Sequence, residues 1–124
     1  MGGSSQEFIE FVLEQLVSIP GLSTSRFFGG IGVKSEATQF AMIMDGALYF
    51  TVDDKSRQTY EQMGSQCFSY DTKKGRVDVR KYYEVPAELL EDHAQLVTLA
   101  RAAIDVAQKS KTSQKPRMRK PFKA

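Results

Sequence analysis

The sequence predicts an α+β domain in which an antiparallel sheet carries flanking helices. Residues 8–17 have apolar side chains at helical spacing, and residues 92–109 repeat this pattern over a longer stretch. Between them, residues 39–52 form two apolar runs separated by Asp45-Gly46, which is typical of a tight hairpin. The chain has 124 residues, 41% of them hydrophobic, so these elements fit one domain with its own core.

The first helix is expected to begin at Ser4-Ser5-Gln6-Glu7, which has the pattern of a capping box. Here the Ser4 hydroxyl and the Glu7 carboxylate would satisfy backbone N–H groups that a first helical turn leaves unpaired. Pro20-Gly21 is expected to end the helix. The apolar face of this helix consists of Phe8, Ile9, Val12, Leu13, Leu16 and Val17.

Strands are expected over about Ser23–Phe28, Ile31–Val33, Gln39–Met44 and Ala47–Val52. Asp45-Gly46 favours a type I′ turn, and a two-residue loop fixes the register of the last pair. One face would then hold Phe40 with Thr51, Met42 with Tyr49, and Met44 with Ala47; the other would hold Ile43 with Leu48 and Ala41 with Phe50.

Both faces of this hairpin are apolar, unlike a sheet with one face in water. We therefore expect helices on one face. A second cover, for which a homodimer partner is a candidate, is expected over Phe40, Met42 and Tyr49.

The remaining elements follow from local signals. Asp53 or Asp54 would cap a helix through Tyr60 and Met63 that ends at Gly64. Residues 67–70 and 76–83 suggest a second hairpin, Pro86 suits the first turn of a short helix, and the longest helix runs from about Asp92 to Lys109.

The charge is divided unevenly along the chain. Seven Lys and Arg residues and no acid follow Gln108, whereas ten basic and fifteen acidic residues precede it, a body charge of about −5. We expect a domain over residues 5–108 and a flexible basic tail over residues 109–124. The tail residues Lys115, Arg117, Arg119, Lys120 and Lys123 are candidates for weak, non-specific binding to nucleic acid, although a solubilising tail or a contact with an acidic partner fits equally well.

No constellation of catalytic or metal-binding residues emerges from the sequence, and we expect neither a catalytic residue nor a metal or cofactor. His93 is the only histidine, and Cys67, the only cysteine, fits a small buried residue better than a reactive thiol. Gly29-Gly30-Ile31-Gly32 is neither GxGxxG nor a Walker A motif, so structural turns or a bulge explain it better than a phosphate site. A single cysteine and the lack of an apolar run of about 18 residues favour a cytoplasmic protein without a membrane partner.

An ordered set of short motifs carries a resemblance over about residues 8–107. Its members are residues 26–32 (RFFGGIG), residues 40–43, residues 45–50 (DGALYF), Gly64, residues 68–70, residues 82–86 (YYEVP) and residues 89–92. The set resembles the TfoX/Sxy N-terminal domain of competence regulators. Two positions depart from the family pattern: Thr51 stands where a Lys is common, and Leu99 where a Trp is common.

The resemblance implies an α+β domain of order α-β-β-β-α-β-β-α, similar to secretion-chaperone-like folds that often pair as dimers. It also implies a non-enzymatic regulatory or adaptor domain whose partners are proteins, including the transcription machinery. We expect the interaction surface at Arg26, Phe27, Phe28, Phe40, Met42 and Tyr49. The alternative is a small-molecule-binding module with a pocket near Phe27-Phe28-Gly29-Gly30, and an enzyme using Cys67 ranks third.

Overall fold

The first helix begins one residue later than its capping signal suggested. The computed structural model describes residues 5–27 and 29–119, with side chains up to Lys109. Helix α1 (Gln6–Gln15) has Ser5 as its N-cap, and the Ser5 hydroxyl accepts from the Phe8 backbone N–H at 3.1 Å. The expected capping box of Ser4 with Glu7 is therefore wrong, because the cap at Ser5 places Phe8 rather than Glu7 at the third helical position.

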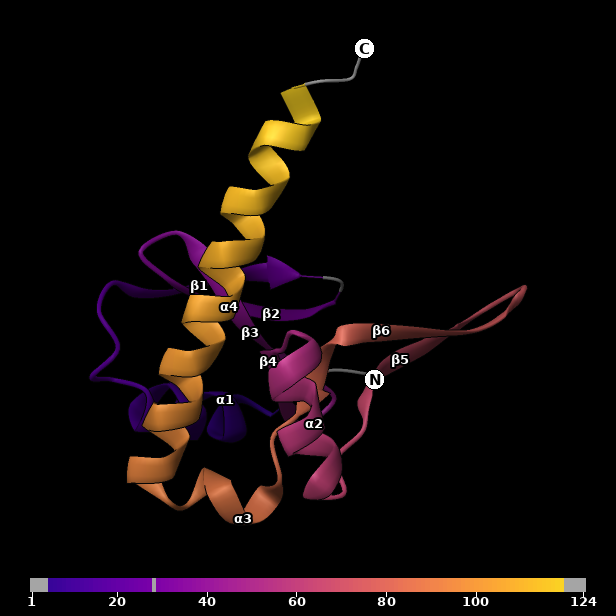
Figure 1. Ribbon diagram of the computed structural model, residues 1–124. Coiled ribbons are helices and arrows are strands. Elements are labelled where there is room, and N and C mark those ends of the chain that lie inside the picture. Colours follow the sequence, from indigo (N-terminus) through magenta and orange to yellow (C-terminus); the bar gives the residue numbers. More distant parts are fainter. Residues whose placement is uncertain (1–4, 28, 120–124) are drawn as a thin grey trace.

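Six antiparallel strands form one sheet in the order β1-β2-β3-β4-β6-β5 (Figure 1). The first four strands are consecutive in the sequence and in space: β1 (Leu22–Phe27), β2 (Gly30–Ser35), β3 (Thr38–Met44) and β4 (Ala47–Thr51). The hairpin prediction for β3 and β4 is confirmed from the Met44–Ala47 pair to the Ala41–Phe50 pair, but the ladder ends before the expected pair of Phe40 with Thr51. Asp45 and Gly46 have φ of 49° and 77°, as a type I′ turn requires.

Helix α2 and a second hairpin complete the sheet. Helix α2 (Asp54–Gln62) follows β4 and is capped by Asp53, and Gly64 follows it with φ 85°. Strands β5 (Cys67–Thr72) and β6 (Gly75–Glu84) form the predicted hairpin, and β6 pairs with β4. The distal part of the hairpin projects away from the rest of the molecule (Figure 1).

The last two helices are α3 (Ala87–Leu90), which follows Pro86, and α4 (His93–Arg119). Helix α4 continues ten residues beyond its expected end at Lys109, and its C-terminal turns extend well past the strands (Figure 1). The residues from Ser110 to Lys115 include no glycine or proline, so a helix that is already packed can propagate through them. The division into a domain of residues 5–108 and a tail from residue 109 stays a prediction.

Helices cover one face of the sheet. Helix α4 packs on β3 and β4, α1 and α3 pack on α4, and α2 packs on β6. The main core lies between these layers and joins strand residues such as Phe50 and Leu48 to Leu16 of α1 and Leu96 of α4, all fully buried. The predicted fold class, α+β with an antiparallel sheet and flanking helices, is confirmed. The observed order has one more strand in the first half and the short helix α3 compared with the order that the resemblance implied, and the local signals predicted both.

Candidate functional site

A second, smaller apolar cluster lies on the opposite side of the sheet from the helices. Its buried members are Met42 and Met44 of β3 and Tyr82 of β6, and Phe27, Tyr49, Phe68 and Val79 pack against them half-buried. Within the described part of the chain, all seven residues belong to strands. We call the surface formed by these seven residues the helix-free face.

The helix-free face contains three of the residues expected at an interaction surface: Phe27, Met42 and Tyr49. Arg26 is exposed on the edge strand β1 and pairs with Ile31, whose side chain packs on the main core, so Arg26 points to the helix side of the sheet. Phe28 lies outside the described residues. The structure thus brings together three of the six expected residues.

Phe40 was expected at the interaction surface, but the structure places it elsewhere. It is fully buried in the main core, with its ring centroid 6.0 Å from that of Phe50. The cause is a bulge: Val33 pairs with Ala41 and Lys34 with Gln39, which leaves Phe40 as an extra residue of β3 without a partner on β2. Alternation by two therefore fails at Phe40, and its side chain joins the helix-covered face.

Met42 does not need a second copy of the chain for its burial. It is only 1% exposed within one copy, because neighbouring side chains of the helix-free face cover it. The residues left half-exposed to a partner are Phe27, Tyr49 and Phe68. A second cover is therefore not needed for Met42, and it stays a prediction for the rim of this cluster.

The space beside Gly30 and Gly32 is filled by side chains. A Cβ at Gly30 would collide with the Met44 sulfur and lie 2.5 Å from the Ile43 carbonyl oxygen, and a Cβ at Gly32 would collide with the Gln39 amide oxygen. Glycine at these positions permits close approach of β3 to β2. The small-molecule pocket was expected near this segment, but the side chains of Met44 and Gln39 occupy the space beside the two glycines.

Tyr82 is a central residue of the helix-free face that was not among the residues expected at the interaction surface. Its hydroxyl accepts a hydrogen bond from the Gln39 amide at 3.1 Å, and its ring lies 6.2 Å from that of Phe27. Burial raises the pKa of Tyr82, and burial also raises the pKa of Tyr49, with a smaller contribution from Glu84. Both phenols stay neutral in the physiological range, so this face is apolar with hydroxyl groups at its edges.

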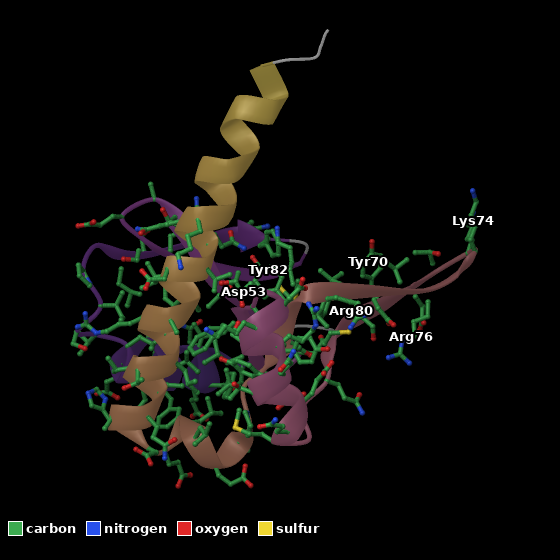
Figure 2. The ribbon with its side chains drawn as sticks, in the orientation of Figure 1. Asp53, Tyr70, Lys74, Arg76, Arg80 and Tyr82 are labelled. Carbon is green, nitrogen blue, oxygen red and sulfur yellow. The ribbon has the colours of Figure 1, made fainter. Side chains whose placement is uncertain are left out.

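The helix-free face also anchors the β5–β6 hairpin. The Phe68 ring meets the Tyr49 ring edge to face at 5.3 Å, and Val79 pairs with Phe68. Beside this pair the register shifts, because Cys67 pairs with Tyr83 and the three intervening residues of β6 have no partner on β5. Figure 2 shows Tyr82 near the root of the hairpin and Tyr70, Arg76 and Lys74 along the part that projects.

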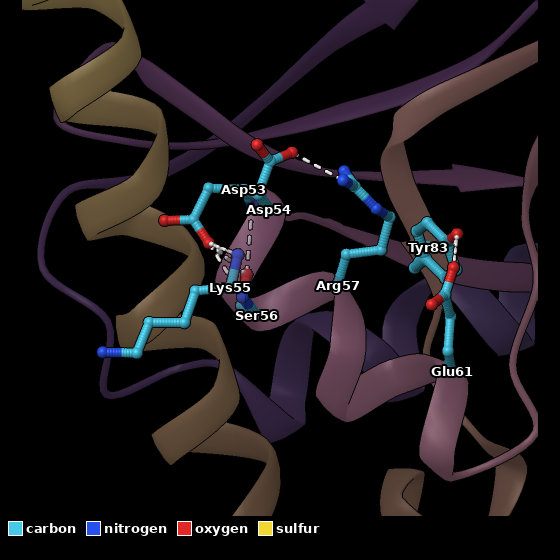
Figure 3. Close-up of polar contacts among 7 residues, drawn as sticks. All are labelled: Asp53, Asp54, Lys55, Ser56, Arg57, Glu61 and Tyr83. Atoms are coloured by element: carbon cyan, nitrogen blue, oxygen red, sulfur yellow. Dashed lines mark hydrogen bonds and ion pairs between the residues drawn. The ribbon is translucent and has the colours of Figure 1, made fainter.

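Helix α2 holds the root of the hairpin from the other side (Figure 3). The Tyr83 hydroxyl donates to the Glu61 carboxylate at 2.7 Å, and this hydrogen bond is the main reason that the pKa of Tyr83 is raised. The N-terminus of α2 is fixed by Asp53, whose carboxylate accepts from the backbone N–H groups of Lys55 and Ser56. The two adjacent acids Asp53 and Asp54 therefore both stabilise the N-terminal turn of α2, since Asp53 caps it and Asp54 pairs with Arg57.

Comparison with known proteins agrees with this fold. Residues 14–107 match the TfoX N-terminal domain. The chain belongs to the TfoX N-terminal domain family. It is also 29% identical over 106 residues to Protein Sxy of Escherichia coli strain K12, an alignment that covers 86% of this chain and 50% of that protein. The chain thus spans about half the length of this curated relative.

Two positions at which this TfoX N-terminal domain departs from the family pattern lie at the contact between the sheet and the helices. Thr51, the first departure from the family pattern, is buried, and its hydroxyl donates to the Ala103 carbonyl of α4 at 2.8 Å. Leu99, the second departure, packs half-buried against the main core. Both side chains therefore contribute to the contact between the sheet and the helices in this TfoX N-terminal domain.

The remaining candidates lie apart from the helix-free face. Lys115, Arg117 and Arg119 belong to the last turns of α4, and Lys120 and Lys123 lie outside the described residues. Cys67 is half-buried, and His93 is exposed at the start of α4. Among the described residues, no three His, Cys, Asp or Glu side chains gather as a metal site, and no helix is long and apolar enough to cross a membrane.

Proposed function

We propose that this TfoX N-terminal domain is a non-enzymatic regulatory or adaptor domain that binds a protein partner through its helix-free face. The observation that supports the proposal is the set of partly exposed aromatic rings Phe27, Tyr49 and Phe68 around a buried centre. Aromatic side chains with an apolar body and a polar rim are enriched where proteins bind each other. The partner class that follows from the family is the transcription machinery, and a second copy of the chain is the other candidate.

The basic residues that follow Gln108 add weak and non-specific affinity for nucleic acid in this proposal. Seven positive charges without an acid can displace counterions from a polyanion, which makes such binding steeply dependent on salt. This contribution is separable from the protein contact, because Lys115 and Arg117 belong to the distal end of α4 and the aromatic rings belong to the sheet.

The proposal is tested by affinity capture from a native bacterial lysate with the full chain as bait. The variant Phe27→Ala/Tyr49→Ala should lose the captured protein, because truncated rings leave no apolar rim. The control is Phe11→Ala/Val17→Ala, which truncates two exposed apolar side chains of α1 and the turn that follows it. Retention of the same partner by the Phe27/Tyr49 variant, with an unchanged melting temperature, would refute the assigned surface.

The contribution of the C-terminal segment is tested separately in the full chain. Substitution of Lys115, Arg117, Arg119, Lys120 and Lys123 by Gln should flatten the salt dependence of polynucleotide binding and leave the captured protein unchanged. Equal salt dependence for this variant and the wild type would remove the segment from the mechanism. Sedimentation velocity on the same samples distinguishes a second copy from a different partner.

A further inference from the structure

The β5–β6 hairpin is a basic arm on an otherwise acidic body. Residues 70–81 hold five of the ten Lys and Arg residues that precede Lys109, namely Lys73, Lys74, Arg76, Arg80 and Lys81, but only two of the fifteen acids. The arm therefore has a formal charge of +3, and the rest of residues 1–108 has a charge of −8. A local charge of opposite sign to its surroundings indicates attraction to a polyanion.

The arm has a fixed root and an exposed tip. Phe68 and Val79 pack into the helix-free face, whereas all residues from 71 to 76 are exposed. The tip turn is ordered by the Thr72 hydroxyl, which donates to the Gly75 carbonyl at 2.8 Å and accepts from the Lys74 backbone N–H at 3.1 Å. Lys73 and Lys74 are thus held at the end of a ribbon whose root packs on the helix-free face.

The length of the arm separates its cations from the acidic body. From Phe68 to the tip is about five residues, or roughly 17 Å of strand. Attraction and repulsion between exposed charges are screened beyond about 8 Å at physiological ionic strength. Lys74 lies at the far end of the hairpin (Figure 2), so an anion there is screened from most of the negative body.

The charges of the arm follow the alternation of β6. Arg76 and Asp78 occupy alternate positions, with Val77 and Val79 on the opposite face, and Arg80 follows where β6 loses its partner on β5. The Arg76 guanidinium lies 3.0 Å from the Asp78 carboxylate, and both side chains are more than half exposed. Asp78 is the one acid within the cationic row, and it offsets the charge of Arg76 in the free protein.

We propose that the β5–β6 arm binds duplex DNA, with Lys73, Lys74, Arg76 and Arg80 on the phosphates. The proposal goes beyond the protein contact of the helix-free face and beyond the basic C-terminal segment. A two-stranded ribbon fits the major groove, which is about 12 Å wide. A narrow projecting ribbon suits a grooved rod better than a flat anionic membrane, which would also meet the acidic body. Contacts to phosphates position the domain without reading the base sequence.

The first test measures binding of the full chain to a labelled 30-base-pair duplex by fluorescence anisotropy over a range of salt. Each phosphate contact contributes about 0.9 to the slope of log affinity against log salt. The variant Lys73→Gln/Lys74→Gln should flatten the slope by up to about 1.8 and weaken binding at 0.1 M salt by up to about 60-fold. The matched control Lys55→Gln/Arg101→Gln removes the same charge from exposed helix positions and should behave as the wild type.

A second variant is expected to raise the affinity of the arm for duplex DNA. Asp78→Asn removes the acid that pairs with Arg76 and repels a phosphate, so the affinity should rise by about threefold. Both arm variants concern exposed side chains, and we expect unchanged melting temperatures. A gain from Asp78→Asn together with a loss from the lysine variant would exclude general unfolding of the arm as the explanation.

The inference is overturned if the Lys73/Lys74 variant and the Lys55/Arg101 control have equal slopes, or if the wild type does not bind the duplex at 50 mM salt. It is also overturned if polyglutamate of matched charge displaces the duplex as well as unlabelled DNA does, since the arm would then be a general polyanion site. Capture of a protein through Phe27 and Tyr49 is unaffected by any of these outcomes. A refutation of DNA binding by the arm can therefore be distinguished from a refutation of the proposed function.

Discussion

Gly30→Ala tests whether the glycines of β2 are required by the close approach of two strands. The Cβ of an alanine at Gly30 would lie 2.5 Å from the Ile43 carbonyl oxygen, whereas ordinary van der Waals contact begins at 3.4 Å. It would also collide with the sulfur of Met44, which is 6% exposed. The backbone oxygen cannot rotate away as a side chain can, so the strands themselves must separate.

The cost follows from what this separation disrupts. Overpacking of a filled site costs about 1–3 kcal/mol, and each ladder hydrogen bond that lengthens adds about 0.5–1.5 kcal/mol. We expect the free energy of unfolding of Gly30→Ala to fall by about 2–4 kcal/mol. This is a large share of the roughly 5–15 kcal/mol that stabilises a small domain.

Two neighbouring glycines provide matched controls. Gly29 has φ 80° and open space around its Cβ position, so Gly29→Ala meets only the left-handed backbone cost of about 1–2 kcal/mol. At Gly32 the obstructing atoms belong to the flexible Gln39 side chain, so Gly32→Ala should cost about 1 kcal/mol through loss of the Gln39–Tyr82 hydrogen bond. Gly30→Ala is thus expected to be the most destabilising of the three.

The assay is urea unfolding of the full chain followed by far-ultraviolet circular dichroism, with the midpoint and slope compared among the three variants. A Gly30→Ala variant that stays within about 0.5 kcal/mol of the wild type would refute the reasoning, because the strands would then accommodate a Cβ without strain. A larger loss for Gly29→Ala than for Gly30→Ala would also refute it, since backbone conformation and not close approach would then select glycine.

Three further variants test the interpretation of single contacts. Phe40→Ala should lower the free energy of unfolding by about 3–5 kcal/mol, as for a fully buried ring. A loss under about 1 kcal/mol would contradict the burial of Phe40 in the main core. Thr51→Val removes the buried hydroxyl that donates to Ala103 and should cost about 1 kcal/mol in urea unfolding, and an equal or higher midpoint would contradict this. The hydrogen bond from the Ser56 backbone N–H is the main cause of the lowered pKa of Asp53 in the folded state. The ionised capping carboxylate therefore stabilises the fold at pH values above the ordinary Asp pKa of about 3.9. This stabilisation is lost as the pH falls through the lowered pKa of the folded state. Asp53→Ala should therefore cost about 1 kcal/mol near pH 7 and less near pH 2, and a difference independent of pH would argue against the charge.

Local signals in the sequence predicted most of the elements. Asp45-Gly46 determined a turn and, through it, the pairing of Met42 with Tyr49. The same reasoning was wrong at Phe40, because the bulge arises from pairing with β2 and the turn encodes only pairing with β4. A register argument extends only as far as the regular ladder does.

The candidate site was predicted less completely than the fold. Phe27, Met42 and Tyr49 were expected at an interaction surface and do gather on one face. Tyr82 and Phe68 belong to the motifs of the resemblance but were not expected at the interaction surface, because their place there depends on the register shift in β6, which no local pattern predicts. The basic arm had a signal in the charge count of residues 70–81, but the whole-body charge of about −5 concealed it.

The sequence by itself determined the presence of the helices, the hairpin turns and the charge of each segment, because these depend on residues that are close along the chain, and the order of its short motifs determined the family. The tertiary structure alone decided which side of the sheet Phe40 faces, what fills the space beside Gly30, and how far the arm projects from the acidic body. Each of these depends on contacts between segments that are distant in the sequence, and packing at close range leaves one arrangement for them.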